Sequence, residues 1–291
     1  MKFFTYIVFR AFVLLFSLIP FDVVYIISDG LRFILKNIFK YRTAVIEKNI
    51  AFCFPKWDKK QVKSTSNSFY KNFIDISLES IKGISSNPHK IIPRYRLTNP
   101  ELLDGYFKNG QSVILFSQHF NNWEWGPICL GLQMKHHVVG VIKKLSNPYI
   151  HKYFAEGRAG NNVSVITTGQ TTNYVLNHKP HKPEALVFIA DQYPYNKHRR
   201  TEVDFFGKQI PFHSGAGQLS KRLNYPIFTI DIIRKGRGRY ELELYKIADS
   251  NHGLNDLEIT SLYAAHLEQL IIKYPDAWLW SHKRFKNQMR Y

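Results

Sequence analysis

Hydrophobic residues run almost without interruption through the start of the chain, from Phe3 to Ser28, broken by Arg10, Pro20 and Asp22. This length is sufficient to span a bilayer. Each charge near a helix centre costs ~2.5–3.5 kcal/mol, against ~0.3–0.6 kcal/mol gained per Leu, Ile, Phe or Val, so insertion is close to balanced. We therefore expect membrane contact, not a span. A secretory signal peptide is the alternative, although no small-x-small cleavage site follows the run.

Residues 31–42 combine a basic and an apolar face at helical spacing. Basic residues recur every fourth position at Arg32, Lys36 and Lys40. The other side of the same helix carries Leu31, Ile34, Leu35, Ile38 and Phe39. This pattern predicts an interfacial helix on an anionic leaflet, with a core helix bearing solvated lysines as the alternative. Together, residues 1–42 are predicted to be a membrane anchor and residues 43–291 a single domain.

The pattern beyond residue 43 is globular and alternates between strands and helices. Helical spacing predicts helices over 59–84 and 256–274. Short apolar runs bounded by turn residues predict buried strands over 112–117, 137–142, 163–166 and 185–190, and a hairpin of 227–233 and 240–247 with a basic tip, RKGRGR. This order predicts an α/β domain with a central mixed, mostly parallel sheet flanked by helices.

The amino-acid composition and net charge exclude several classes of protein and indicate the charge of the partner. Hydrophobic residues make up 45% of the 291, which excludes disorder as the main state. A mean hydropathy of −0.26 excludes a polytopic membrane protein. The net charge of +18 predicts an anionic partner: nucleic acid, anionic lipid, an acidic carrier protein or a phosphorylated substrate. Cys53 and Cys129 have apolar flanks and are expected to be buried reduced thiols.

The candidate chemistry lies at the end of the 112–117 strand, in QHFNNWEWG. His119 and Glu124 are five residues apart, so they would not face each other on one regular helix. With Asn121 or Asn122 as the N-cap, Glu124 falls in the first helical turn and can reach back to a loop-borne His119. The sequence therefore predicts a His119–Glu124 dyad with a general-base histidine, where a satisfied structural histidine is the alternative.

Other chemistries lack their motifs. There is no His-Glu-x-x-His for zinc and no phosphate-binding loop, and we expect neither a metal nor a cofactor. In HSGAG at 213–217, Phe212 and Ala216 stand where a nucleophile elbow around Ser214 would need glycines. The segment instead predicts a turn that opens a helix around Ser220.

A series of motifs in order resembles the bacterial lipid A late acyltransferases, the lauroyl/myristoyl type within the glycerolipid His-x-x-x-x-Asp/Glu acyltransferase superfamily. The motifs are NIAFCFP at 49–55, HFNNWE at 119–124, DQ at 191–192, FFG at 205–207 and PDAWLWSHKRFK at 275–286. The last is the most specific, and the resemblance covers nearly the whole chain.

The resemblance implies transfer of a fatty acyl group from an acyl carrier protein thioester to a hydroxyl of a phosphorylated lipid A precursor. It implies work at the cytoplasmic face of the inner membrane, with no cofactor besides that thioester. An acidic carrier protein, an anionic glycolipid acceptor and an anionic membrane surface all match the positive charge. Acyl length, acceptor hydroxyl and oligomeric state stay open.

Further site residues follow from the same comparison, each with a structural alternative. Arg158 is the candidate oxyanion donor beside backbone amides near Asn121, although its spacing to Gly160 departs from the family pattern. Asp191 and Gln192 are expected on the sheet edge of His119, to order the loop or bind substrate. The acyl slot is assigned to Phe205, Phe206 and Gly207, and phosphosugar binding to an extended segment with Trp280, His282 and Arg284 on one face.

Two alternative functions stay open at this point. The same chemistry can act on a lysophospholipid or an aminoacyl lipid. A non-catalytic basic protein that binds nucleic acid also fits the charge, but it leaves the apolar N-terminus unexplained and has no recognition motif.

Overall fold

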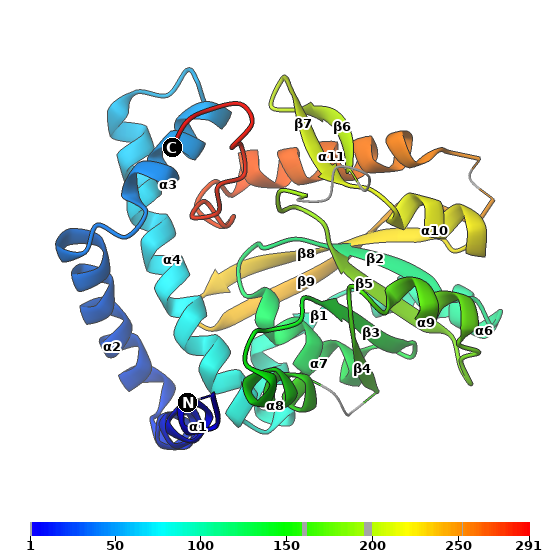
Figure 1. The fold of residues 1–291 in the computed structure, drawn as a ribbon, viewed down its shortest axis with the longest axis horizontal. Helices are drawn as coiled ribbons and strands as arrows, with labels where there is room; N and C mark the ends of the chain where they lie inside the picture. The colour runs from blue at the N-terminus through cyan, green and yellow to red at the C-terminus, as the bar shows by residue number, and fades with distance from the viewer. Residues whose placement is uncertain (1, 159–161, 195–199, 252) are drawn as a thin grey trace.

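The computed structural model describes residues 2–158, 162–194, 200–251 and 253–291 (Figure 1). Its α-helices are α1 (Lys2–Leu18), α2 (Phe21–Phe33), α3 (Thr43–Cys53), α4 (Lys59–Ser85), α5 (Pro88–Ile91), α6 (Asp104–Lys108), α7 (Gly126–Gln133), α8 (Pro148–Arg158), α9 (Thr171–Asn177), α10 (Ala216–Leu223) and α11 (Asp256–Lys273). Short 3-10 or π turns are η1 (Ile34–Ile38), η2 (Ile92–Arg94), η3 (Pro100–Leu103) and η4 (Trp123–Trp125). The strands are β1 (Tyr95–Leu97), β2 (Val113–Ser117), β3 (His137–Ile142), β4 (Val163–Thr167), β5 (Glu184–Ile189), β6 (Arg200–Phe205), β7 (Lys208–His213), β8 (Ile227–Gly236) and β9 (Arg239–Ala248).

The main sheet of the described residues has seven strands in the order β1-β9-β8-β2-β5-β3-β4. Strands β8, β2, β5, β3 and β4 run parallel, while β9 is antiparallel to β8 and parallel to β1. The predicted α/β domain with a mixed, mostly parallel sheet is therefore confirmed. The β6–β7 hairpin forms a separate two-stranded sheet that the pattern of hydrophobic residues did not predict.

The central strands are buried on both faces, which is why they appear in the sequence as continuous apolar runs. All five residues of β2 are buried. Helix α7 packs on one face of this sheet, while α11, the β6–β7 hairpin and the C-terminal segment cover the other face (Figure 1).

Local sequence signals begin the two long helices that frame the sheet. A capping box at Asp58 and Gln61 starts α4, and another at Asn255 and Glu258 starts α11. The unpredicted hairpin turns at Phe206 and Gly207, whose φ angles of 53° and 68° are those of a tight two-residue turn.

Helix α4 lies across the carboxyl edge of the parallel strands and buries two acids there. Asp75 and Glu79 are both 0% exposed. Asp75 accepts a hydrogen bond from Arg234 of β8 at 2.7 Å, and Glu79 accepts one at 2.8 Å from Asn122, which follows β2. The helix therefore holds the ends of two strands together.

The basic tip of the β8–β9 hairpin is part of the same network. Arg237 bonds both Asp75 and Asp29 of α2 at 2.9 Å, and Arg234 also bonds Asp75. Buried or partly buried carboxylates therefore already pair with these two arginines.

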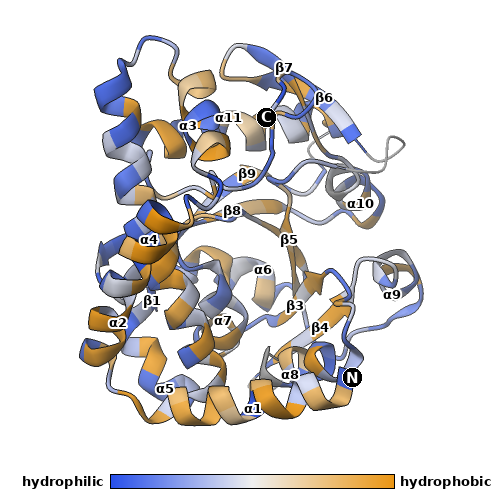
Figure 2. Ribbon diagram, turned by 60° about the vertical axis from the view of Figure 1, so that its left-hand side comes forward, coloured by the Kyte–Doolittle hydropathy of each residue, from blue (hydrophilic) through white to orange (hydrophobic). Residues whose placement is uncertain are grey.

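The N-terminal helices pack on the body of the domain. Phe16 of α1 and Val24 of α2 form a small core with Ile74 and Leu78 of α4. The predicted single helix over residues 31–42 is instead the end of α2 followed by the π-helix η1. Apolar residues also cover the outer face of α1 and α2 (Figure 2). Among the described residues, no helix combines the length and apolar character needed to cross a membrane.

Candidate active site

His119 and Asp191 form the centre of the site because they follow two neighbouring parallel strands. Ser117 at the end of β2 pairs with Ile189 at the end of β5, so the loops after both strands leave the same sheet edge. The Nδ1 atom of His119 lies 2.7 Å from Oδ1 of Asp191. Its backbone N–H donates to Oδ2 of Asp191 at 2.9 Å. The carboxylate therefore fixes both the backbone and the ring of His119.

Asp191 is itself held by a residue from the end of the chain. Trp278 donates its indole N–H to Oδ2 at 2.8 Å, and the Asp191 side chain is 2% exposed. Burial raises the pKa of Asp191, but the adjacent His119 and these hydrogen bonds outweigh burial and hold the pKa below its ordinary value. Asp191 is thus an ionised acceptor, which places the imidazole proton on Nδ1.

The opposite ring nitrogen is left as the acceptor. Nε2 of His119 lies 3.0 Å from the amide nitrogen of Gln192, which can donate to its lone pair. The His119 side chain is 18% exposed, so substrate can approach the ring. With Nδ1 held by an acid and Nε2 unprotonated, the pair has the geometry of a general base.

The loop after β2 is held by polar contacts on several sides. Asn121 has a left-handed φ of 49° and donates to the carbonyl of Ile232 in the middle of β8. Asn122 accepts from the backbone of Trp125 and so caps η4, as predicted from the sequence. Backbone amides of His119, Asn121 and Trp125 already have acceptors, so these three are not available as oxyanion donors.

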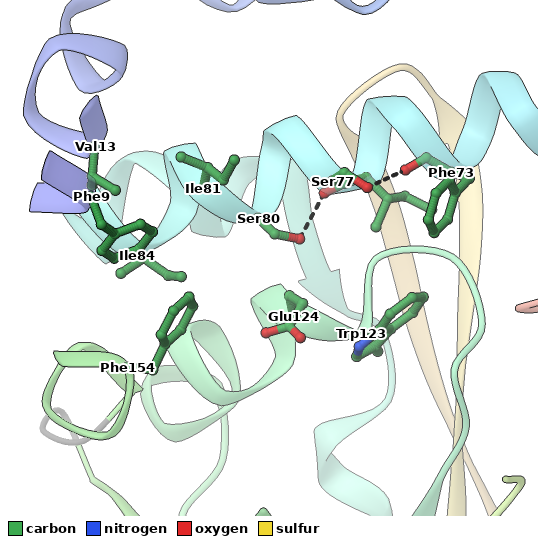
Figure 3. Close-up of a pocket in the computed structure, with 11 residues that line it drawn as sticks. Phe9, Val13, Phe73, Ser77, Ser80, Ile81, Ile84, Trp123, Glu124 and Phe154 are labelled. Atoms are coloured by element: carbon green, nitrogen blue, oxygen red, sulfur yellow. Dashed lines mark hydrogen bonds between the residues drawn. The ribbon is translucent and has the colours of Figure 1, made fainter. Parts of the chain in front are cut away.

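Asp191 occupies Nδ1 of the imidazole, the atom at which the sequence placed Glu124, so the catalytic role of Glu124 stays a prediction. Glu124 does lie in the first turn after the loop, as predicted. Its neighbour Trp123 makes an edge-on contact with the His119 ring, with centroids 5.1 Å apart. The η4 turn points Glu124 and Trp123 toward a cavity between helices instead (Figure 3).

This cavity has a volume of about 230 Å³ and lies between α1, α4, α8 and η4. Its wall is mostly apolar, and the small side chains Ser77 and Ser80 of α4 leave the space open (Figure 3). The lining residues are Phe9, Val13, Phe73, Ile76, Ser77, Ser80, Ile81, Ile84, Trp123, Glu124 and Phe154. Because Trp123 touches both the cavity and His119, the apolar space adjoins the base.

The predicted acyl slot at Phe205, Phe206 and Gly207 is not this cavity. Phe205 is 0% exposed and packs against Phe212, Trp278 and Phe285 in the core. Gly207 lies in the β6–β7 turn, where its positive φ explains the glycine. Phe205, at the end of β6, is therefore a core residue, and the apolar cavity beside His119 lies on the α1–α4 side.

The C-terminal motif forms turns behind the catalytic pair, not an extended segment with a substrate-facing side. Trp280 is 0% exposed and donates to the carbonyl of Pro275, and Arg284 is 1% exposed. Asn49 of α3 donates to the carbonyls of Trp280 and His282 at 2.7 and 2.8 Å. Motifs more than 200 residues apart therefore meet beneath His119 and support its loop.

Arg158 ends α8, close in the chain to Phe154 of the cavity wall. Its side chain lies outside the described part of the structure, as does Gly160, so its oxyanion role stays a prediction. A basic cluster in the sequence, Lys197 to Arg200, also lies mostly outside the described residues, and the structure describes only its last member, Arg200.

Sequence reasoning missed the role of Asp191 and the location of the cavity. It placed Asp191 on the correct sheet edge, but it offered Glu124 as the partner because Glu124 is nearer in the chain. The signal for Asp191 was an acid directly after a buried strand; the adjacency of β2 and β5 was needed to use it.

A histidine–aspartate pair with the geometry of a general base, at the carboxyl edge of a mostly parallel sheet and beside an apolar cavity, is typical of an α/β enzyme. The sequence profile of the bacterial lipid A biosynthesis acyltransferases matches residues 2–287, and the chain belongs to this family. It is therefore an acyltransferase, and the expectation of an enzyme is confirmed.

One relative is the lipid A biosynthesis lauroyltransferase of Escherichia coli (strain K12). It is 22% identical to this chain over 276 residues, which cover 93% of this chain and 87% of the relative. The family match over residues 2–287 includes both the N-terminal helices and the C-terminal motif.

Proposed function

We propose that this enzyme transfers a fatty acyl group from an acyl carrier protein thioester to a hydroxyl of a lipid A precursor. The observation that carries the proposal is the 2.7 Å contact between His119 Nδ1 and Asp191, which leaves Nε2 to accept a proton. The family and the lauroyltransferase relative favour lipid A over a lysophospholipid or an aminoacyl lipid as acceptor.

In the proposed reaction, Nε2 of His119 removes the proton of the acceptor hydroxyl as its oxygen attacks the thioester carbonyl. Collapse of the tetrahedral intermediate breaks the C–S bond, and the departing thiolate takes the proton from the imidazolium. A positioned base of this kind contributes ~10²–10⁴ in rate. The side-chain amide of Gln192 contacts Nε2 in the structure. In the reaction this amide moves away from Nε2, or it forms a hydrogen bond with the incoming hydroxyl.

The acyl chain is proposed to occupy the cavity between α1, α4 and α8. Its apolar wall suits a hydrocarbon, and Trp123 joins it to His119. Glu124 stays a proposed site residue, and it lines the wall of this cavity. On this proposal, α1 is part of the active site, because Phe9 and Val13 form one side of the cavity.

The outer surface of α1 and α2 is proposed to lie on the cytoplasmic face of the inner membrane. Large apolar side chains are exposed there, among them Phe4 at 72%, Leu15 at 68% and Ile26 at 72%. The net charge of +18 suits an anionic leaflet, an acidic carrier protein and a phosphorylated glycolipid. Fractionation tests this: an apolar anchor stays in the membrane pellet at high salt and is released by detergent.

Replacement of His119 by Ala tests the reaction itself. Transfer of radiolabelled acyl chain from the carrier protein to lipid acceptor is expected to fall by ~10²–10⁴, the contribution of a positioned base. His89→Ala, an exposed histidine before η2, serves as the matched control and should keep its activity. Unchanged turnover of the His119 variant would remove this residue from the mechanism. Mass analysis of lipids after deletion identifies the acceptor, with underacylated lipid A expected.

A further inference from the structure

Glu79 of α4 is a buried acid that the proposed reaction does not use. It is 0% exposed, and three neutral side chains donate to its carboxylate. Tyr25 of α2 donates to Oε1 at 3.0 Å, whereas Tyr240 of β9 and Asn122 of the loop after β2 donate to Oε2 at 2.7 and 2.8 Å. Carboxylate oxygens are acceptors, so this side chain suits a place where three donors meet. Glu79 therefore joins α2, β9 and the loop that carries His119.

The contact with Glu79 fixes which way the side-chain amide of Asn122 faces. Because the carboxylate offers acceptor atoms, the NH₂ group of Asn122 points to it, and the amide oxygen is left for the backbone N–H of Trp125 at 3.2 Å. That second contact caps the η4 turn. A half-turn of the amide would set its NH₂ against the Trp125 N–H and lose both hydrogen bonds. Glu79 therefore determines whether η4 is capped.

The backbone of the same residue holds the other end of η4. Trp125 donates its indole N–H to the carbonyl of Glu79 at 2.9 Å. Gly83, one turn further along α4, leaves room for this ring, because a Cβ atom there would clash with the indole nitrogen. One turn of α4 thus contacts both ends of η4, through the carboxylate and the carbonyl of a single residue.

Two different parts of the molecule hold the two halves of this loop. The carbonyl of His119 accepts from the backbone of Leu279 at 3.0 Å, and the N–H of Asn121 donates to the carbonyl of Ala277 at 2.9 Å. The first half is therefore paired with the C-terminal segment. From Asn122 onward the contacts pass to α4, so the place of η4 relative to His119 depends on that helix.

The η4 turn is the part of the loop that borders both the base and the cavity. Trp123 lies edge-on to the His119 ring, and Trp123 and Glu124 line the cavity (Figure 3). We propose that Glu79 is a positioning residue of the reaction, which sets η4 through Asn122 so that the acyl cavity meets the base. This rests on the proposed function, in which His119 is the base and the cavity holds the acyl chain.

The test reverses one hydrogen bond in the full-length enzyme. N122D keeps an oxygen to cap η4 but sets a second carboxylate against Glu79. We expect kcat/KM for acyl transfer to fall by about 10–100-fold, since a misplacement of about 1 Å can cost ~10²-fold. In E79Q/N122D the introduced amide donates to the introduced carboxylate, and the hydroxyl of Tyr240 can turn to accept from it. Because the two changes are coupled, the double variant should return to within about threefold of the wild type.

Two single variants accompany this pair. E79Q alone should stay within about threefold of the wild type, because its NH₂ can face Tyr25, whose hydroxyl accepts as well as donates. N87D makes the same Asn-to-Asp change at the exposed cap of α5, where the side-chain oxygen accepts from His89, and should leave activity unchanged.

The product distinguishes positioning from a purely structural role. Mass analysis of the lipid made from a mixed acyl-carrier pool should show an altered chain-length distribution for N122D, because η4 forms one wall of the cavity. The double variant should restore the wild-type distribution. Rates are measured below the unfolding temperature of each variant, followed by circular dichroism, so that loss of folded protein does not contribute.

A folded N122D with wild-type kcat/KM and product distribution would overturn the proposal, as would a double variant no better than N122D. If N122D does not fold, N122S keeps a cap oxygen, loses the amide and carries the same expectation. H119A is measured beside them. If H119A is active, the proposed function fails, whereas an inactive H119A with a normal N122D overturns only this inference.

Discussion

Replacing Asp191 with Asn is the sharpest perturbation of the site, because it preserves shape and removes one acceptor. In the wild type, Oδ1 accepts from His119 Nδ1, while Oδ2 accepts from both the His119 backbone and Trp278. The new NH₂ group has to replace one of these oxygens. At Oδ2 it would face two N–H donors, and at Oδ1 it would face one nitrogen that can become an acceptor.

The structure therefore predicts which way the amide turns. Each buried donor left unsatisfied costs ~1–3 kcal/mol, so an NH₂ at the Oδ2 position costs ~2–6 kcal/mol for its two donors. At the Oδ1 position the imidazole avoids the penalty by moving its proton to Nε2. That tautomer cannot accept a proton from the hydroxyl, and the equivalent change in serine proteases lowers kcat by ~10⁴.

We expect D191N to remain folded and to lose ~10³–10⁴ in kcat, with KM little changed. The assay is transfer of labelled acyl chain from carrier protein to lipid acceptor, with circular dichroism as the check on folding. D249N, which removes an exposed carboxylate paired with Lys246 at 2.8 Å, is the control. A folded D191N with kcat within about threefold of wild type would refute the assignment of the base, since a wrong tautomer costs far more.

Three further predictions follow from the same geometry. S80F partly fills the cavity of about 230 Å³, so the product from a mixed acyl-carrier pool should shift to shorter chains in mass analysis; an unchanged distribution would place the chain elsewhere. Y25F removes a buried 3.0 Å hydrogen bond to Glu79 and should lower the free energy of unfolding by ~1–2 kcal/mol in denaturant titration, whereas the exposed Tyr149→Phe should not. Because the pKa of Asp191 is lowered in the folded state, its contribution to stability is present above its unfolded pKa of ~3.9 and is lost as pH falls through the folded pKa. The melting temperatures of wild type and D191N should therefore converge in acid, and a constant difference would contradict the lowered pKa.

The N-terminal region shows why a boundary drawn from composition differs from one drawn from contacts. Residues 1–42 differ so strongly in hydrophobicity from the rest that the sequence indicates a separate anchor. In the structure Tyr25 and Ser28 of α2 hydrogen-bond Glu79 and Asp75 of α4. The polar residues of the largely apolar helix α2 are therefore the ones that contact α4. A local sequence pattern does not show these contacts, because their partners lie about 50 residues further along the chain.

Glu124 and Asp191 show the limit of spacing arguments. A partner five residues away is easily proposed, since the chain itself brings it near. Asp191 is 72 residues from His119 in sequence, and the two meet because β5 lies beside β2. Strand order is set by how the whole sheet packs its helices, and no short window contains that information.

Hydrophobic periodicity alone determined the helices α4 and α11, the central parallel strands and the β8–β9 hairpin, because local burial patterns repeat with the period of each element. It also determined that a histidine and an acid stand at strand ends, where α/β enzymes place their sites. Tertiary structure alone decided that Asp191 holds the imidazole and that the apolar cavity lies against α1. These depend on contacts between distant segments, whose energies arise only when the chain is packed.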